Sequence, residues 1–131
     1  WLIFVITGEA EALAGHALPS CAETLDFARG LTSRGVAEVL IIARGAEGSV
    51  MWANDQGWFA NAAKVKVVSR VGAGDSFMGG FTLALAQGLP LDQALSHGAA
   101  AASAAVMTPG TQLCRREDFE RLLVETRTTP L

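Results

Sequence analysis

The sequence has no uninterrupted apolar run of the roughly 18 residues that a helix needs to cross a bilayer. Residues 1–6 are apolar but too few, and residues 99–107 are mainly alanine and are interrupted by Ser103. We also find no basic segment followed by an apolar core, the pattern of a signal peptide. These absences argue against a membrane protein, and we expect a chain that works in the cytoplasm.

Cysteine and basic charge are also scarce. The only two cysteines, Cys21 and Cys114, lie far apart without metal-ligand spacing, so we expect reduced thiols. The net charge of −3 gives no electrostatic reason to expect a nucleic acid or an anionic membrane as partner. His97 has no His or Cys partner at ligand spacing. Half of the 131 residues are hydrophobic and 18% are charged, which suits a folded globular domain.

Strand and helix patterns alternate along the chain and predict a layered α/β fold. We expect strands at residues 1–7, 38–43, 49–53, 57–60 and 64–68, and helices at 9–14, 19–33, 75–87, 91–107 and 116–126. Asn54-Asp55-Gln56 is typical of a hairpin turn. We find no repeat or linker and expect one domain over residues 1–131. Because the chain opens on Trp1 directly in a predicted core strand, we expect it to be the C-terminal portion of a longer polypeptide.

One segment combines two glycines and an acidic residue just before a helical pattern: Val71-Gly72-Ala73-Gly74-Asp75-Ser76-Phe77. Glycines let backbone N–H groups approach an anion, and a helix N-terminus adds partial positive charge. A carboxylate is out of place in a loop that only holds phosphate. It fits if Asp75 takes the proton from a hydroxyl that attacks the phosphate, so the segment indicates phosphoryl transfer.

Two common nucleotide motifs are missing. No Gly-x-x-x-x-Gly-Lys-Ser/Thr occurs, which excludes a P-loop NTPase. Phe77 stands where the dinucleotide fingerprint requires its third glycine, which disfavours a dinucleotide-dependent oxidoreductase. A structural alternative stays open, in which Asp75 is an ordinary cap of a tight strand-to-helix turn.

The helix predicted after this loop contains two further glycines, Gly79 and Gly80, which each cost about 1 kcal/mol relative to alanine. Such glycines usually permit the close approach of a neighbouring element or ligand. The spacing of Phe77, Phe81 and Leu85 predicts a stripe that faces the core.

Residues 68–77, Val68-Ser69-Arg70-Val71-Gly72-Ala73-Gly74-Asp75-Ser76-Phe77, resemble the C-terminal signature of the PfkB (ribokinase-like) carbohydrate kinases. Ser-x-Val before Gly72, where ribokinases favour Asp-Thr, is similar to the phosphofructokinase and tagatose-phosphate kinase branch. The resemblance covers essentially the whole chain, but only the C-terminal part of a kinase more than twice as long. It implies a ribokinase-like α/β/α fold with a mostly parallel sheet, and it leaves the sugar-binding part and the lid outside this chain. It also implies that Asp75 is the general base and that the amides of Gly72, Ala73 and Gly74 hold the transferring phosphoryl group.

The resemblance further implies a nucleotide site. The turn Gly45-Ala46-Glu47-Gly48 matches one that touches nucleotide phosphates in the family, although these residues on their own favour a plain turn. Ala43 stands where the family often has a hydroxyl, which removes one phosphate contact. Arg70 borders the phosphate loop, where it either contacts a phosphate or is solvated. The residues implied at the nucleotide are Gly45, Gly48, Val71, Gly72, Gly74, Ala99 and Ser103, the last two on a small-residue helix that tight packing also explains.

Two metal sites are implied in the same way. Glu9 matches the glutamate of the family's Asn-x-x-Glu motif, which helps to position Mg²⁺. Its asparagine position is Ile6, and Phe4-Val5-Ile6 stands where close relatives tend to have Lys-Pro-Asn. Read without the family, Glu9 is a charge in the first turn of a helix. A K⁺ site is implied at Ser69, Val71, Ala105, Thr108 and Gly110.

The resemblance therefore implies ATP-dependent phosphorylation of a phosphorylated ketohexose, fructose 6-phosphate or fructose 1-phosphate. ATP and Mg²⁺, with K⁺ as a further ion, are the expected cofactors, and the parent enzyme is expected to be a homodimer. Because the residues that grip the sugar are not in this sequence, we expect the chain alone to be inactive. Two alternatives stay open: a degenerate module that binds nucleotide without catalysis, and another PfkB sugar kinase such as tagatose-6-phosphate kinase or ribokinase.

Overall fold

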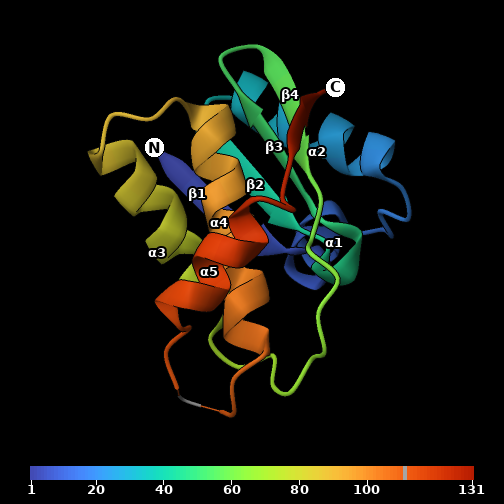
Figure 1. Ribbon diagram of the computed structural model, residues 1–131. Helices are drawn as coiled ribbons and strands as arrows, with labels where there is room; N and C mark the ends of the chain where they lie inside the picture. Colours follow the sequence, from blue (N-terminus) through green and yellow to red (C-terminus); the bar gives the residue numbers. More distant parts are fainter. Residues whose placement is uncertain (111) are drawn as a thin grey trace. The chain divides into compact units, whose positions relative to one another are not determined.

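The computed structural model describes residues 1–110 and 112–131, which form two compact units (Figure 1). The first unit comprises Trp1–Phe59 and Thr129–Leu131, and the second comprises Ala60–Thr128. A five-stranded sheet has the order β1-β2-β3-β4-β5. Its strands are β1 (Leu2–Ile6), β2 (Val39–Ala43), β3 (Ser49–Ala53), β4 (Gln56–Ala60) and β5 (Thr128–Pro130).

The sheet is mixed, so the expectation of a mostly parallel sheet is wrong. β1 and β2 are parallel, with Phe4 opposite Ile41, because two helices carry the chain back between them. β2 and β3 are antiparallel, with Ile41 opposite Met51. Only residues 44–48 join β2 to β3, and so short a connection permits only an antiparallel return. The three-residue strand β5, which ends in Pro130, was not among the expected strands.

Helices α1 (Thr7–Ala14) and α2 (Cys21–Ser33) cover one face of the sheet in the first unit (Figure 1). As expected, α1 ends at Gly15, which adopts φ 76°. α2 begins two residues later than expected because Ser20 caps it: Ser20 Oγ accepts from the Glu23 amide at 3.2 Å. The core on this face is Ala10, Leu18, Ala28, Leu40 and Ile42, with Ile3, Val5, Ala14, Phe27, Leu31 and Trp52 packed against it.

The predicted hairpin is confirmed as β3 and β4 joined by Asn54 and Asp55. Both residues have positive φ, 51° and 57°, which a two-residue turn of this kind requires. Asparagine and aspartate tolerate that conformation better than other non-glycine residues. The local turn chemistry therefore predicted this connection correctly, except that β4 starts at Gln56 rather than at Gly57.

The second unit is built from α3 (Ala73–Ala86), α4 (Leu91–Val106) and α5 (Arg116–Leu123). α4 packs against both α3 and α5. A Cβ added at Gly80 of α3 would lie 2.7 Å from the His97 carbonyl oxygen, and one at Gly98 of α4 would lie 2.7 Å from the Phe77 ring. These two glycines let the helices approach closely, as we expected for Gly80, whereas a Cβ at Gly79 would meet nothing within 4 Å.

Residues 64–68 form no strand, so that prediction is wrong. The alternation is present only in part, since Lys64 and Lys66 are exposed while Val65 packs against the cluster of Ala63, Ala104 and Leu122, but Val67 is 49% exposed. Val65 thus packs against residues of α4 and α5, and the segment is not one of the five strands of the sheet. Alternating hydrophobicity indicates which side chains can be buried, but it does not indicate whether strands or helices cover them.

The predicted core stripe on α3 is correct for Phe77 and Phe81, which are 3% and 0% exposed, and wrong for Leu85, which is 37% exposed. At 3.6 residues per turn, the eighth residue after Phe77 lies about 80° away from it around the helix, whereas the seventh lies about 20° away. That seventh residue is Ala84, which is fully buried.

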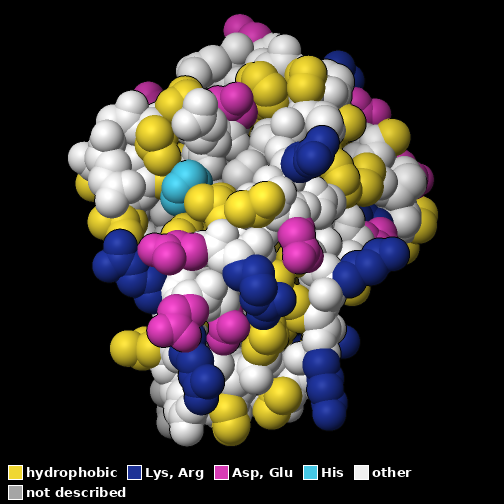
Figure 2. Space-filling view, in the orientation of Figure 1, with side chains coloured by type: hydrophobic (Ala, Val, Ile, Leu, Met, Phe, Trp, Pro, Cys, Tyr) yellow, Lys and Arg dark blue, Asp and Glu magenta, His cyan; other side chains and the backbone are white. Residues whose placement is uncertain are grey.

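α5 has an exposed, charged surface. Basic and acidic side chains alternate over the α5 region in Figure 2, and Arg116 and Arg121 pair with Glu120 and Asp118 at 2.8 and 3.3 Å. Arg115 is exposed as well, so these arginines are solvated as expected. No helix within the described residues has the length and apolar character to span a membrane.

Candidate active site

The glycine segment forms the turn that starts α3. Gly72 is the N-cap residue and has φ 79°, a conformation that glycine adopts without strain. Its carbonyl accepts the first helical hydrogen bond from the Ser76 amide at 2.9 Å. Before it, the Val71 amide donates to Ser69 Oγ at 3.2 Å. Ser69 thus shapes the loop through its side chain, a contribution that the sequence analysis missed.

Backbone N–H groups remain available at this helix start. The Ala73 amide makes a long hydrogen bond of 3.4 Å to the Arg70 carbonyl. Within the described part of the chain, the amides of Gly72, Gly74 and Asp75 have no acceptor. The first amides of a helix lack intrahelical partners and carry the positive end of the helix dipole. The turn can therefore offer two of the three expected amides freely, together with that of Asp75 itself.

The Asp75 carboxylate is exposed in the first turn of α3. Among the described residues it has no hydrogen-bond donor and no cation within ion-pair distance. An interpretation in which Asp75 is simply the N-cap of α3 does not fit, because Gly72 occupies that position. Arg70, which we expected either to contact phosphate or to be solvated, is exposed without an ion pair among the described residues.

The second glycine turn follows β2 in the first unit. Gly45–Glu47 form one turn of 3-10 helix, with Gly45 at φ 59° and Gly48 at φ 107°. The Arg44 amide donates to the Gly48 carbonyl at 2.8 Å and closes the turn. Two positive φ values explain why this position requires two glycines.

Glu9 lies at the same end of the sheet as this turn. Ile6, the last residue of β1, is opposite Ala43, the last residue of β2, so both strands end at one edge. Glu9 Oε2 accepts from the Ile6 amide at 3.0 Å and so caps α1. Thr7, which the sequence analysis missed, donates from Oγ1 to the Ala43 carbonyl at 3.0 Å and puts a hydroxyl at this edge. Ile6 itself is 51% exposed.

The residues expected at a K⁺ site gather in the second unit. The amides of Val68 and Ser69 both donate to the Val106 carbonyl, at 2.7 and 3.2 Å, which places the start of the glycine segment beside the end of α4. Thr108 is buried, with Oγ1 2.8 Å from the Ala105 carbonyl oxygen and 3.1 Å from that of Gln112. The Ala105 carbonyl also accepts from the Thr108 amide at 3.1 Å. Two donors thus already occupy that carbonyl. Thr111 lies outside the described residues.

The two expected nucleotide residues of α4, Ala99 and Ser103, are 5% and 6% exposed. His97 of the same helix has a structural explanation. Its Nδ1 lies 2.9 Å from the Gln93 carbonyl oxygen, and its ring lies 5.8 Å from that of Phe119.

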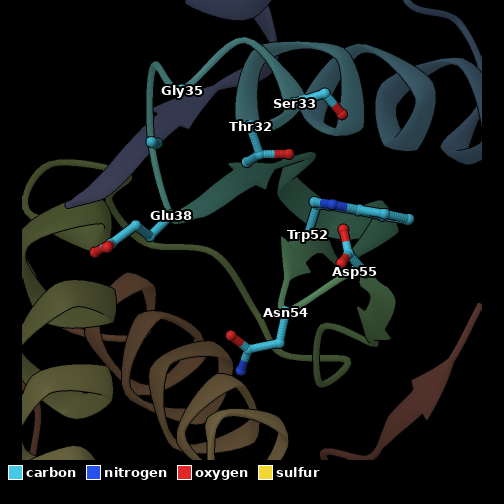
Figure 3. A pocket seen from close by; sticks show the side chains of 8 residues that line it. Thr32, Ser33, Gly35, Glu38, Trp52, Asn54 and Asp55 are labelled. Atoms are coloured by element: carbon cyan, nitrogen blue, oxygen red, sulfur yellow. The ribbon is translucent and has the colours of Figure 1, made fainter.

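An open pocket of about 290 Å³ lies at the other end of the sheet from the turn of residues 45–48 (Figure 3). It is lined by residues that include Thr32, Glu38, Trp52, Asn54 and Asp55. Glu38 precedes β2 and Asn54 follows β3, whereas Gly45 follows β2, which fixes the two ends as opposite. A hydrogen bond from the amino group of Trp1 lowers the pKa of Glu38. None of the residues implicated in phosphoryl transfer lines this pocket.

Comparison with known proteins identifies the family. The model of the pfkB family carbohydrate kinases matches residues 1–118. The chain belongs to this family. It is 32% identical to 1-phosphofructokinase of Bacillus subtilis over 123 residues, which is 94% of this chain and 40% of that protein. It is 34% identical to ATP-dependent 6-phosphofructokinase isozyme 2 of Mycobacterium tuberculosis over 113 residues, or 86% of this chain and 33% of that protein. The chain thus spans about two fifths or less of the length of these pfkB relatives.

A solved structure agrees with the family assignment. Phosphofructokinase-2 from Escherichia coli, in complex with potassium, matches with a TM-score of 0.87 and 29% identity over 95% of this chain and 40% of that chain. Other structures of the same protein contain substrates and products or show a tetrameric inhibited form. The α/β fold with flanking helices is therefore that of the ribokinase-like kinases.

Proposed function

We propose that this chain is the C-terminal, nucleotide-binding part of a single pfkB-type kinase domain that phosphorylates a phosphorylated ketohexose with ATP. Fructose 6-phosphate and fructose 1-phosphate are the proposed substrates, since relatives at 32–34% identity are 1-phosphofructokinases and 6-phosphofructokinases. The chain covers 40% of its B. subtilis relative, which supports the view that the sugar-binding part lies elsewhere. We therefore expect no turnover by the 131 residues alone.

One observation carries the proposal: Asp75 is exposed and unpartnered in the described structure, beside free amides at a helix start. A sugar hydroxyl that donates its proton to Asp75 would attack the γ-phosphorus of ATP, whose phosphoryl group the amides of Gly72 and Gly74 would hold. The bond from this phosphorus to the β–γ bridging oxygen would break, and ADP would leave. In a loose transition state the proton need not move early, so an ionised carboxylate suffices as the base. Positioning and electrostatic stabilisation then supply most of the rate acceleration.

In the first unit, the turn of residues 45–48 is proposed to contact nucleotide phosphates. In the second unit, the start of α3 is proposed to hold the transferring phosphoryl group, and Ala99 and Ser103 are proposed to contact the base and ribose. Mg²⁺ would offset the negative charge of the phosphates, and in such sites it takes only one or two protein carboxylates. Glu9 is the proposed carboxylate, acting through water. Val71 and Ser69 carbonyls, with the loop around Thr108 and Gly110, are the proposed K⁺ ligands.

A second candidate function, nucleotide binding without catalysis, is favoured by one specific observation. An apolar Ile6 is half exposed at the strand end where the family places a polar group, and Ala43 beside it has no hydroxyl. Both changes weaken the grip on phosphate and metal. Neither removes Asp75 or the turn before it, and for that reason we place the catalytic interpretation first.

The experiment compares Asp75→Asn with Asp92→Asn in the longer polypeptide that carries the sugar-binding part. Both aspartates lie in the first turn of a helix, α3 and α4, so the second variant controls for loss of charge at a helix start. Loss of a general base lowers the rate by about 10²–10⁴. We expect Asp75→Asn to lose at least 100-fold in kcat and to keep its affinity for ATP, and Asp92→Asn to keep both.

Two outcomes would contradict the proposal in different ways. Equal sugar phosphorylation by the native protein and Asp75→Asn would refute the role of this residue. No phosphorylation by either, together with tight ATP binding, would support the non-catalytic alternative.

A further inference from the structure

Arg44 is a charged residue that the structure buries almost completely. Its side chain is 4% exposed, although arginine is rarely buried unless it is fully paired. Its Nη1 donates to the Leu18 carbonyl at 2.8 Å and to Thr24 Oγ1 at 2.5 Å. Its Nη2 donates to the Pro19 carbonyl at 3.0 Å and to Glu47 Oε2 at 2.7 Å, and Nε donates to the same oxygen at 3.2 Å. These five bonds use all five N–H groups of the guanidinium.

The backbone of Arg44 belongs to the turn that follows it. Its amide donates to the Gly48 carbonyl at 2.8 Å, and its carbonyl accepts from the Glu47 amide at 3.2 Å. The side chain of Glu47 then returns to the guanidinium. Arg44 is therefore bonded to the turn of residues 45–48 through its amide, its carbonyl and its guanidinium. The guanidinium also links this turn to the segment between α1 and α2.

We infer that Arg44 is a positioning residue for this turn, and that it sets the affinity for ATP without touching the nucleotide. The inference rests on the proposed function of the turn as a phosphate-binding element. An arginine beside a phosphate turn commonly binds phosphate itself. Here no donor is left for a ligand, so Arg44 can act only through the geometry it imposes. Gly45, at φ 59° and exposed, is the part of the turn that this geometry holds in place.

The carbonyls of Leu18 and Pro19 explain why this position requires a guanidinium. They lie before α2, 26 and 25 residues away in the sequence, and three further acceptor contacts come from Thr24 and Glu47. A lysine ammonium has three donors without the planar fork and cannot meet four acceptor groups in this arrangement. Arg44→Lys should therefore fail to restore the function, although it keeps the charge.

The test measures two properties of the 131-residue chain, ATP binding by calorimetry and amide hydrogen exchange of residues 44–48. Native protein is compared with Arg44→Met, which keeps much of the buried volume, with Arg44→Lys, and with Leu40→Ala as a control. Leu40 belongs to the same core as Leu18 but makes none of the five bonds, so Leu40→Ala lowers stability without releasing the turn.

We expect Arg44→Met and Arg44→Lys to raise the exchange rate of the turn amides and to weaken ATP binding by about tenfold, the order expected for loss of charge-assisted hydrogen bonds. Leu40→Ala, at the same fraction folded, should leave both unchanged. If Arg44→Met does not fold, Glu47→Ala provides the same test, because the Glu47 side chain is 67% exposed and its removal releases two of the five bonds.

The outcomes separate the inference from the proposed function. Faster exchange of the turn with unchanged ATP affinity overturns Arg44 as a positioning residue. An unchanged exchange rate of the turn amides would show that Arg44 does not hold the turn in place, whatever the affinity for ATP. If native chain binds no ATP, the proposed nucleotide site is refuted and this inference fails with it, while the exchange data still report whether Arg44 holds the turn.

Discussion

Two adjacent glycines of α3 allow a matched test of helix packing in the second unit. Gly79 is exposed, and a Cβ there would have no atom within 4 Å. A Cβ at Gly80 would lie 2.7 Å from the His97 carbonyl oxygen and 2.8 Å from the Ala101 Cβ. The His97 oxygen belongs to the backbone of α4, and the Ala101 Cβ is bonded directly to that backbone. A methyl group at Gly80 therefore fits only if α4 moves away from α3.

The expected magnitudes follow from two opposing effects. Alanine in place of glycine stabilises a helix interior by about 1 kcal/mol. Inserting a methyl group into a packed interface costs about 1–3 kcal/mol. Gly79→Ala should therefore raise the unfolding free energy by the helix-propensity gain alone. Gly80→Ala has the same gain but also the packing cost, so its unfolding free energy should fall by the difference between the two. The two variants should therefore differ by about 1–3 kcal/mol in unfolding free energy, with Gly79→Ala the more stable.

Urea denaturation followed by far-ultraviolet circular dichroism measures this difference, since α3 and α4 dominate the helical signal of the second unit. With a urea m value of about 2 kcal/mol/M, the two midpoints should be about 1 M apart. Tryptophan fluorescence is a poor probe here, because Trp1, Trp52 and Trp58 all belong to the first unit. Equal midpoints for the two variants would refute the close approach of α3 and α4 at Gly80.

The remaining predictions concern the first unit. Asp55→Gly should raise the melting temperature by about 4 °C, because glycine adopts the φ of 57° at a saving of about 1 kcal/mol. Asp55→Ala should lower the melting temperature. A change of the melting temperature in the same direction for both variants would contradict the turn assignment. Glu9→Gln keeps an oxygen for the Ile6 amide and should leave stability unchanged, whereas Glu9→Ala should lose about 1 kcal/mol by thermal denaturation. If Glu9 also serves Mg²⁺, both variants should bind ATP less tightly only when Mg²⁺ is present, and equal binding with and without the ion would exclude that role.

The sequence predicted the elements whose ends are set by neighbouring residues. Gly15 ends α1, and Asn54 with Asp55 turns the hairpin, each through contacts within a few residues. The expected start of α2 at Pro19 was two residues early, because Ser20 caps this helix. The same reasoning failed for strand pairing. Residues 64–68 alternate like a strand but join no sheet, because pairing depends on segments distant in the sequence. The resemblance implied a mostly parallel sheet, whereas the short connection of residues 44–48 makes β2 and β3 antiparallel.

The candidate site divides in the same way. The placement of Asp75 and the glycines before it at a helix start could be predicted, because a carboxylate and flexible backbone before an apolar helical pattern are local features. The sequence could not show that the Ala73 amide donates to the Arg70 carbonyl, whereas the Gly74 amide has no acceptor among the described residues. It also gave no signal for Arg44, whose partners Leu18 and Thr24 lie 26 and 20 residues away.

Magnitudes decide how far the two departures from the family pattern weaken the proposed enzyme. A hydrogen bond to a charged group contributes about 1.5–3 kcal/mol, so the missing hydroxyl at Ala43 costs roughly 10–150-fold in nucleotide affinity. Thr7 Oγ1 already lies 3.0 Å from the Ala43 carbonyl oxygen, so a hydroxyl is present at that strand end although its proton is in use. Losing a general base costs about 10²–10⁴ in the chemical step itself. The departures therefore act on binding, which a higher ATP concentration can offset, whereas the turn that carries Asp75 is intact. For that reason we place catalysis by the proposed whole enzyme ahead of the non-catalytic alternative.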